Sequence, residues 1–150
     1  MKKRTLLLAL AGCGIAAATV AVVAPPQRLR SPTAVAATPS ASAEILVYYF
    51  HATTRCATCR KIEAYAKETV TTRFASDLEA RRVEWQAVNV DEAANRHFIR
   101  DFGLYTRSVV IVDARHPKRF KVLDQTWQLV RDKEAFQKYV EQEIRAFRRS

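Results

Sequence analysis

"ILVYYFHATTRCATCRKIEAYAKE", residues 45–68, decides the fold of this chain. Its first part, 45–50, is apolar, β-branched and aromatic, and it is long enough for a buried strand but too short for a helix. From Cys56 onward the apolar residues take on helical spacing. Cys56 and Cys59 are therefore expected in the loop after a central strand and in the first turn of the helix that follows.

Three further strands are predicted downstream. The segment "VEWQAVNV" (83–90) alternates between apolar and other residues, as a strand does. "VVIV" (109–112) is a short apolar run, and "RFKVL" (119–123) alternates as an edge strand should. The turn "ARHPKR" makes the last two strands antiparallel, whereas strands joined through helices are expected to be parallel.

Three helices are expected between and after these strands. In the first, apolar residues recur every four positions and overshoot the helical turn by about 40° per step, so we expect a bend or break near "TVTTR" (69–73). Asp91 is expected to cap a helix that runs to Phe102 and stops at Gly103. Asp132 is expected to cap the last helix. The apolar stripe of that helix consists of Phe136, Tyr139, Val140, Ile144 and Phe147.

The predicted order β-α-β-α-β-β-α describes an α/β domain at residues 44–150. Two segments of different composition precede it. Residues 1–24 combine a basic start with an uncharged apolar run, which is typical of a signal peptide or a membrane anchor. Residues 25–43 are rich in Pro, Ala, Ser and Thr and offer little to bury, so they are expected to be a flexible linker.

The end of the leader admits three outcomes. Leu10-Ala11-Gly12-Cys13 resembles the bacterial lipobox, in which the cysteine is acylated to give a lipoprotein. The apolar run from Thr5 to Ala24 is also long enough to stay as an uncleaved membrane anchor. Cleavage within the Ala-rich linker is the third outcome. All three place the domain outside the cytoplasm, and the first two keep it on the membrane, facing the periplasm or the cell exterior.

The charge distribution argues against nucleic-acid binding. Residues 44–150 hold twenty basic and fifteen acidic residues, a net charge of +5. Most of the basic residues are interspersed with acids, and no stripe of basic and aromatic residues or known nucleic-acid motif is present. These charges are expected to form solvated faces.

The predicted position of the cysteine pair favours redox chemistry. A helix N-terminus lowers the pKa of a thiol there, because free N–H groups and the helix dipole stabilise a thiolate. Arg55 and Arg60 flank the pair and act in the same direction. Cys56 is then the exposed nucleophile, and Cys59, one turn later, is the resolving thiol.

This arrangement resembles the thioredoxin-like superfamily over nearly the whole domain. "ILVYYF" followed by "CATC" is similar to its first core strand and redox motif, and "VNVDEAANRHFIRDFGL" is similar to its second strand and capped helix. Together with "DQTWQLVRDKEAF", these segments resemble small exported bacterial proteins labelled the ArsF family of nitroreductase subunits. The resemblance implies a thioredoxin fold with a redox-active disulfide. No flavin or nicotinamide motif appears, so no cofactor beyond that disulfide is expected.

Two positions depart from the superfamily pattern. The usual cis-proline beside the cysteines is replaced by Ser108. We expect the Arg107–Ser108 peptide to be trans and the Ser108 hydroxyl to donate to the Cys56 thiolate, while Arg107 offers backbone groups to a substrate. The buried acid of thioredoxin itself is also missing, because Tyr48 or Phe50 falls in its place.

Three other interpretations stay open, and the least favoured is an interaction module that keeps the fold without the chemistry. A structural disulfide is disfavoured, because its short loop contributes little chain entropy. A metal site is the stronger rival, since Cys56, Cys59 and His51 offer ligands that suit Cu(I) or Zn(II). The leading hypothesis is an extracytoplasmic thiol–disulfide oxidoreductase. Its expected partners are protein thiols or disulfides and, as an electron source, a transmembrane electron-transfer protein.

Overall fold

The computed structural model describes residue 39 and residues 41–150. The predicted leader 1–24, its Cys13 and most of the linker 25–43 lie outside the described residues. Within the described part of the chain, no helix is both long and apolar enough to cross a membrane.

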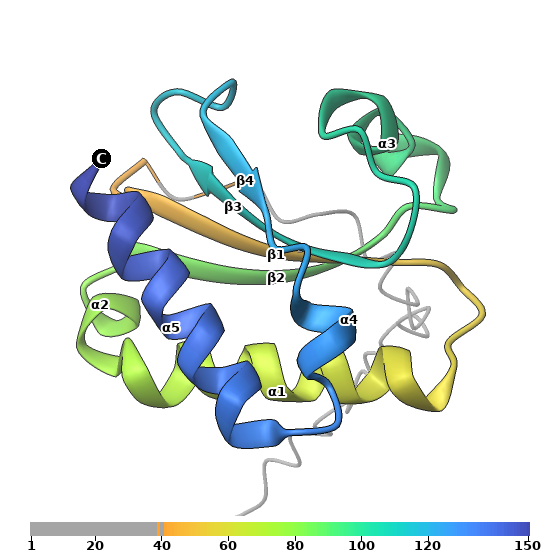
Figure 1. The fold of residues 1–150 in the computed structure, drawn as a ribbon. Helices are drawn as coiled ribbons and strands as arrows, with labels where there is room; N and C mark the ends of the chain where they lie inside the picture. Colours follow the sequence, from red (N-terminus) through yellow and green to blue (C-terminus); the bar gives the residue numbers. More distant parts are fainter. Residues whose placement is uncertain (1–38, 40) are drawn as a thin grey trace, which may run out of the picture. The chain divides into compact units, whose positions relative to one another are not determined.

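The domain is a mixed α/β structure built on one four-stranded sheet (Figure 1). Its strands are β1 (Ile45–His51), β2 (Val83–Asn89), β3 (Ser108–Asp113) and β4 (Phe120–Val122). They are arranged in the order β2-β1-β3-β4, with β1 and β2 parallel and the pairs β1–β3 and β3–β4 antiparallel. All four strands lie where the sequence predicts them, and the antiparallel pairing of β3 with β4 is confirmed.

The direction of β3 contradicts the sequence prediction. A strand reached through a helix was expected to be parallel to its predecessor, yet β3 runs antiparallel to β1 and therefore to β2. The reason lies in the connection, whose helix α3 (His97–Asp101) has only five residues. Such a helix is about 8 Å long, whereas returning along a seven-residue strand requires about 23 Å. The chain therefore stays at the carboxyl end of β2 and starts β3 there.

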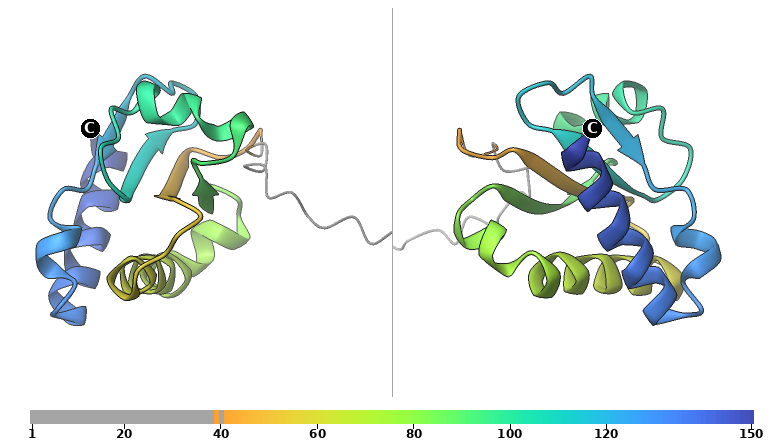
Figure 2. Two further views of the ribbon diagram at one scale, coloured as in Figure 1. Left: turned by 90° about the vertical axis from the view of Figure 1, so that its right-hand side faces the viewer. Right: turned by 60° about the vertical axis from the view of Figure 1, so that its left-hand side comes forward.

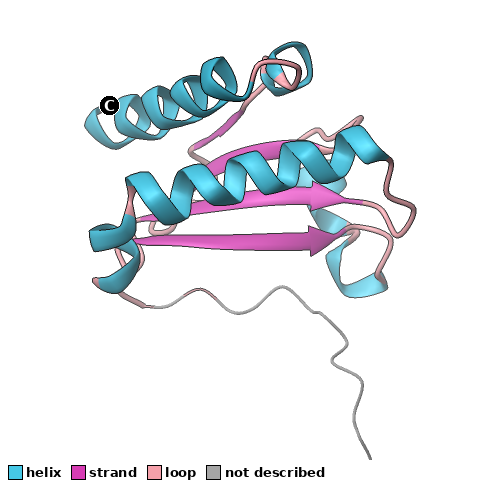
Figure 3. Cartoon of the chain, turned by 90° about the horizontal axis from the view of Figure 1, so that it is seen from below, coloured by secondary structure: helices cyan, strands magenta, loops and turns pink. Residues whose placement is uncertain are grey.

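Helices cover both faces of the sheet (Figures 2 and 3). One face packs against α1 (Ala57–Arg73) and α5 (Lys133–Arg149), with Tyr49 of β1 in the core between them. The opposite face packs against the segment that contains α3, where Tyr48 and Phe50 meet Phe98 and Phe102. Alternate residues of β1 therefore serve two separate cores, which explains why the whole strand is apolar.

The first helix breaks close to the position that its apolar spacing predicts. It ends at Arg73, and Phe74, with φ −125° and ψ 26°, separates it from the short α2 (Ala75–Glu79). The break keeps Phe74 in the core at 1 % exposure and lets Leu78 pack against the same cluster. The predicted break is confirmed.

The region after β2 differs from the prediction. Asp91 does not cap a long helix: the chain forms a 3₁₀ helix, η1 (Ala93–Asn95), and then the short α3. The Asp91 carboxylate instead accepts a hydrogen bond from the Thr53 backbone N–H at 2.7 Å. The Asp91 side chain is turned toward the neighbouring loop, and both η1 and α3 begin without a side-chain cap. Gly103, at φ +61°, ends the segment as expected, because that backbone conformation favours glycine.

The C-terminal helix forms as predicted. The Asp132 side chain accepts a hydrogen bond from the Ala135 backbone N–H at 3.0 Å and so caps α5. Its predicted stripe faces α1 and the sheet, with Tyr139 packed at the edge of the core. A short helix that was not predicted, α4 (Thr126–Leu129), precedes α5 and brings Trp127 toward the start of β3.

Candidate functional site

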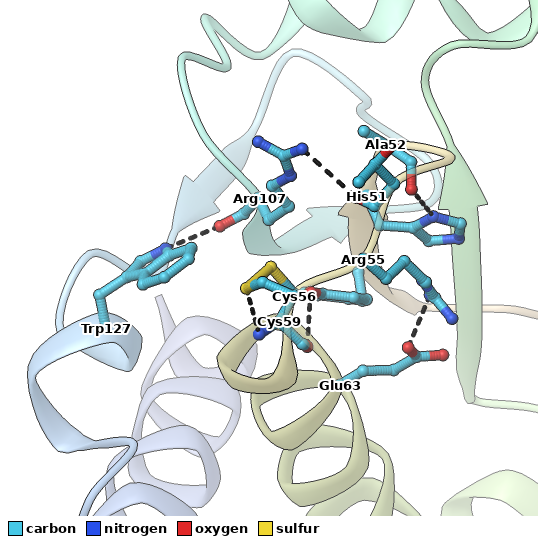
Figure 4. The surroundings of a disulfide bond; sticks show 10 residues. His51, Ala52, Arg55, Cys56, Cys59, Glu63, Arg107 and Trp127 are labelled. Carbon is cyan, nitrogen blue, oxygen red and sulfur yellow. Dashed lines mark hydrogen bonds and ion pairs between the residues drawn. A yellow bond between two sulfur atoms is a disulfide. The ribbon is translucent and has the colours of Figure 1, made fainter.

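Cys56 and Cys59 form a disulfide at the start of α1 (Figure 4). Cys56 is the N-cap residue of this helix, and Cys59 lies in its first turn. Their Cα atoms are 5.0 Å apart, within the range that a disulfide spans. The predicted pair is therefore brought together at the predicted junction of strand, loop and helix.

The two sulfurs lie in different environments. Cys56 is exposed, whereas Cys59 is only 4 % exposed. The Cys59 backbone N–H donates a hydrogen bond to the Cys56 sulfur at 3.0 Å. A donor in this place stabilises negative charge on that sulfur, as does the helix N-terminus itself, and the first turn of α1 contains no acidic residue. The geometry thus favours Cys56 as the attacking thiolate.

The two flanking arginines are placed differently. The Arg55 guanidinium pairs with the Glu63 carboxylate at 2.6 Å, and both side chains are about three-quarters buried. Much of the Arg55 charge is therefore compensated by a neighbour on α1. Arg60 is exposed on the first turn of α1. Of the two, Arg60 is better placed to add uncompensated positive charge near the pair.

The Arg107–Ser108 peptide is trans, as expected, since the described residues contain no cis peptide bond. Cys56 is part of the disulfide here, so the hydrogen bond from Ser108 to its thiolate stays a prediction. With the disulfide closed, Ser108 is 6 % exposed and its hydroxyl donates to the Thr106 carbonyl at 3.0 Å. A hydroxyl has one proton to donate. In the turn before β3 that proton goes to the Thr106 carbonyl and not to the Cys56 sulfur.

Arg107 connects three parts of the site. Its backbone carbonyl accepts a hydrogen bond from the Trp127 indole N–H at 2.9 Å. Its guanidinium donates to the Thr54 carbonyl at 3.4 Å, two residues before Cys56. Figure 4 shows Arg107 and Trp127 around the disulfide. The predicted substrate-binding position therefore lies beside the cysteine loop, with its backbone carbonyl already accepting a hydrogen bond from Trp127.

His51 is not grouped with the two cysteines as a metal site. Its Nδ1 lies 3.0 Å from the Ala52 carbonyl oxygen, and its ring stacks on Tyr49. Across residues 41–150, no cluster of three or more His, Cys, Asp or Glu side chains is arranged to hold a metal ion. The ligand set considered from the sequence is thus not brought together in this structure.

Sequence reasoning missed Tyr49, which connects the sheet to the disulfide. Its hydroxyl donates a buried hydrogen bond to the Cys59 carbonyl at 2.7 Å. Burial, reinforced by the nearby Glu63 carboxylate and opposed by Arg55 and Arg107, raises the pKa of Tyr49 to about 12. Strand alternation carried the signal for this contact, because it places Tyr49 on the same face as Ile45 and Val47. Trp127 had no comparable signal in the sequence.

Tyr49→Phe is expected to cost about 1 kcal/mol of unfolding free energy at neutral pH, the usual net value of one hydrogen bond. It should also reduce the unfolding free energy that the protein loses as the pH rises into the alkaline range. An unfolded tyrosine ionises near pH 10, whereas folded Tyr49 ionises at about 12. The stabilisation is therefore complete below pH 10 and is lost as the pH rises to 12. Urea unfolding between pH 7 and 12 measures both effects.

Tyr48→Phe is the matched control. Burial raises the pKa of Tyr48 to about 12 as well, with Glu84 adding to the effect, but its ring faces the opposite core. Tyr48→Phe should also reduce the loss of unfolding free energy between pH 10 and 12. It should leave the hydrogen bond from Tyr49 of β1 to Cys59 of α1 intact. If wild type and Tyr49→Phe lost the same unfolding free energy between pH 10 and 12, the raised pKa assigned to Tyr49 would be wrong.

The site therefore combines an exposed sulfur at a helix N-terminus, a buried partner sulfur one turn later, and a ring of residues from β1, α1, α4 and the loop before β3. These parts are suited to reversible opening of the disulfide from its exposed side. No protein-family model, curated protein or solved structure matches this chain.

Proposed function

We propose that residues 44–150 act as a thiol–disulfide oxidoreductase whose exchanging groups are Cys56 and Cys59. One observation carries this proposal: the disulfide joins an exposed N-cap cysteine to a buried cysteine of the same helical turn. A structural disulfide has no need of an exposed sulfur with a hydrogen-bond donor aimed at it. In a disulfide that opens and closes, exposure lets a substrate reach Cys56, and the donor stabilises the thiolate that opening produces.

The exchange proceeds in two displacements. The Cys56 thiolate attacks one sulfur of a substrate disulfide, a mixed disulfide forms, and the other substrate sulfur leaves as a thiolate. Cys59 then loses its proton to solvent and attacks the Cys56 sulfur, which releases the second substrate thiol. Two electrons have passed from the cysteine pair to the substrate. The reverse sequence oxidises a substrate dithiol and leaves the pair reduced.

The proposal includes a thioredoxin-like fold. Support comes from the parallel pair of edge strand β2 with central strand β1, from β3 and β4, which continue the sheet in antiparallel pairings, and from helices on both faces of the sheet. The position of the cysteine pair at the start of α1, the helix that follows β1, supports it further. The resemblance to the exported ArsF family belongs to the same proposal and rests on the sequence segments alone.

The proposed location is outside the cytoplasm and tethered to the membrane. It is supported by the basic and apolar leader in 1–24, which is followed by a linker poor in groups to bury. In an oxidising compartment a reductase needs a source of electrons. The proposed partners are therefore protein thiols or disulfides and a transmembrane protein that supplies or removes electrons.

A redox titration of the purified full chain tests the function. The chain is equilibrated in glutathione buffers, alkylated, and mapped by mass, so that Cys56 and Cys59 are counted separately from Cys13. We expect one two-electron transition, with a potential above about −300 mV. Structural disulfides are more resistant to reduction than this. A potential well below that value would overturn the proposal, and metal analysis of the reduced sample tests the copper or zinc alternative.

A further inference from the structure

Three basic segments of the chain lie together at one end of the domain. They are residues 81–82, 115–119 and 148–149. Ile45 pairs with both Val83 and Asp113, so the first segment comes just before β2 and the second just after β3, at the end where β1 begins. The third segment ends α5, and Arg148 pairs there with Glu44, the residue before β1, at 3.6 Å. Figure 1 shows the start of β1, the β3–β4 turn and the end of α5 at this same end.

Three acidic residues at this end are paired with arginines of the segments. The pairs are Asp77 with Arg82 at 2.8 Å, Asp113 with Arg119 at 3.0 Å, and Glu44 with Arg148 at 3.6 Å. In these pairs the positive and negative charges balance. The pairs also hold the three segments to α2, to β3 and to the start of β1, so the segments have fixed places in the folded domain.

Four further cations at this end have no such partner. They are Arg81, Arg115, Lys118 and Arg149, all of them exposed. Within residues 41–150, none of the four side chains pairs with a carboxylate. Glu79, two residues before Arg81, is exposed as well and offsets part of their charge. The surface formed by these four residues, called the basic end below, is therefore positive and attracts anions.

A small pocket opens within this surface. Its volume is about 190 Å³, and Arg115, Arg119 and Arg148 are among the residues that line it. Sites for drug-sized molecules and cofactors have volumes of about 300–1,000 Å³, so this pocket is too small for an anion of the size of a nucleotide. A single phosphate group is a better match for its size and for the arginines around it, because guanidinium and phosphate groups form strong paired hydrogen bonds.

The basic end is also where the chain enters the domain. Glu44 directly precedes β1, and the leader 1–24 and the linker 25–43 precede Glu44 in the sequence. A flexible chain of the linker's nineteen residues spans about 25 Å on average. With the leader in the membrane, as proposed above, this end of the domain stays within that range of the lipid headgroups. Their effective concentration is therefore high enough for weak contacts to form.

The cysteine pair lies at the other end of the sheet. β1 runs from Ile45, at the basic end, to His51, where the cysteine loop begins. Seven residues of strand are about 23 Å long, and Cys56 follows beyond them in the chain. Contact between the basic end and a flat surface therefore leaves Cys56 on the side of the domain that faces away from that surface.

We propose that the basic end docks on the anionic lipid headgroups of the membrane that tethers the chain. The inference rests on the proposed tether and does not depend on the redox chemistry. Each Lys or Arg near an anionic membrane strengthens binding about fivefold, so four of them hold the domain against the bilayer while the tether prevents its escape. Docking keeps Cys56 out of the headgroup layer and presents it to proteins of the extracytoplasmic space.

The test compares how close two fluorescent labels come to the membrane. The full-length chain is inserted into phosphatidylcholine vesicles, with or without phosphatidylglycerol, that carry a nitroxide quencher on some headgroups. One protein carries the label at Ala80→Cys, next to Arg81, with all native cysteines replaced by Ser. The other carries it on Cys56, with Cys13 and Cys59 replaced by Ser.

On vesicles with phosphatidylglycerol we expect the label at residue 80 to be quenched several times more strongly than the label on Cys56, because a nitroxide quenches only at short range. On phosphatidylcholine alone the two labels should be quenched to similar extents, since the domain then rotates freely about its linker. Salt at about 1 M, which screens charges beyond about 3 Å, should reduce the difference to that same level.

Arg115→Glu combined with Lys118→Glu tests the surface itself. Removing two cations should lower the ratio of docked to free domain by about 25-fold, and the two added carboxylates should lower it further, so the difference between the labels should be lost. Arg131→Glu combined with Lys138→Glu is the matched control. It changes the net charge equally, at exposed residues near the start of α5 and far from the basic end, and it should keep the difference. Urea unfolding checks that each variant is folded.

The outcomes separate docking from the tether. Equal quenching of the two labels on both kinds of vesicle would overturn the docking proposal and leave the tether and the oxidoreductase intact. Loss of the difference in the Arg131→Glu/Lys138→Glu control would also overturn it, because overall charge and not the basic end would then be responsible. A chain that does not float with the vesicles at high salt would overturn the proposed tether, and the docking with it.

Discussion

Cys59→Ser is expected to accumulate stable mixed disulfides with substrate proteins, and Cys56→Ser is expected to accumulate almost none. Cys56 is the exposed sulfur and receives the Cys59 N–H, so it makes the first attack. Without Cys59 nothing resolves the intermediate, whereas without Cys56 the buried Cys59 cannot reach a protein substrate. Both variants should lose turnover by on the order of a thousandfold or more, as removal of a nucleophile does.

Non-reducing electrophoresis of cells that express each full-length variant, followed by mass spectrometry of the shifted bands, measures the trapping. The variant lacking both Cys56 and Cys59 is the matched control, because it retains Cys13 and shows any adducts formed there. More adducts with Cys56→Ser than with Cys59→Ser would reverse the assigned roles. Equal, undiminished turnover in both variants would exclude the pair from the chemistry.

Phe136→Ala is expected to destabilise the domain by about 3–5 kcal/mol. Phe136 has no exposed surface, and it lies in the core between α5, α1 and the sheet, with its ring 5.7 Å from that of Tyr65. Truncation removes this burial and leaves a cavity that the surrounding helices cannot fully close. Urea unfolding at neutral pH measures the loss.

Lys138→Ala provides the control on the same helix. Lys138 is exposed two residues later, and both Lys and Ala are good helix formers. Its replacement should change stability by less than about 0.5 kcal/mol. If Phe136→Ala cost no more than Lys138→Ala, the packing of α5 described above would be wrong.

The sequence by itself determined the elements whose signals are local. A run of apolar β-branched and aromatic residues can form only a buried strand at the length of β1, and Cys56 follows where the helical spacing begins. Asp132 carries its own cap signal, since the N–H that it accepts from lies three residues away. The four-residue spacing of apolar residues predicted a break in the first helix, which Phe74 provides. In each case the interacting groups are neighbours in the chain.

The prediction for Asp91 failed although its signal was also local. An aspartate at the end of a strand can cap a helix or accept from another loop, and the donors that the fold brings near it decide which it does. Thr53, far away in sequence, supplies that donor. Ser108 is a similar case, because its hydroxyl donates to the Thr106 carbonyl in a turn that the sequence pattern did not predict.

The tertiary structure alone decided the direction of β3 and the surroundings of the disulfide. The sequence order of strands and helices did not reveal that α3 is too short to return along the sheet, and this length reverses β3. That reversal places Arg107 beside the cysteine loop, where its backbone carbonyl accepts from the Trp127 indole N–H. It also brings residues 104–107 to the carboxyl ends of β1 and β2, where they line one pocket together with residues 50–52, 90–91 and 99. Contacts between segments far apart in the chain depend on how the sheet is assembled. Side-chain patterns in the sequence indicate only whether a residue is buried, so they do not identify the residue that it contacts.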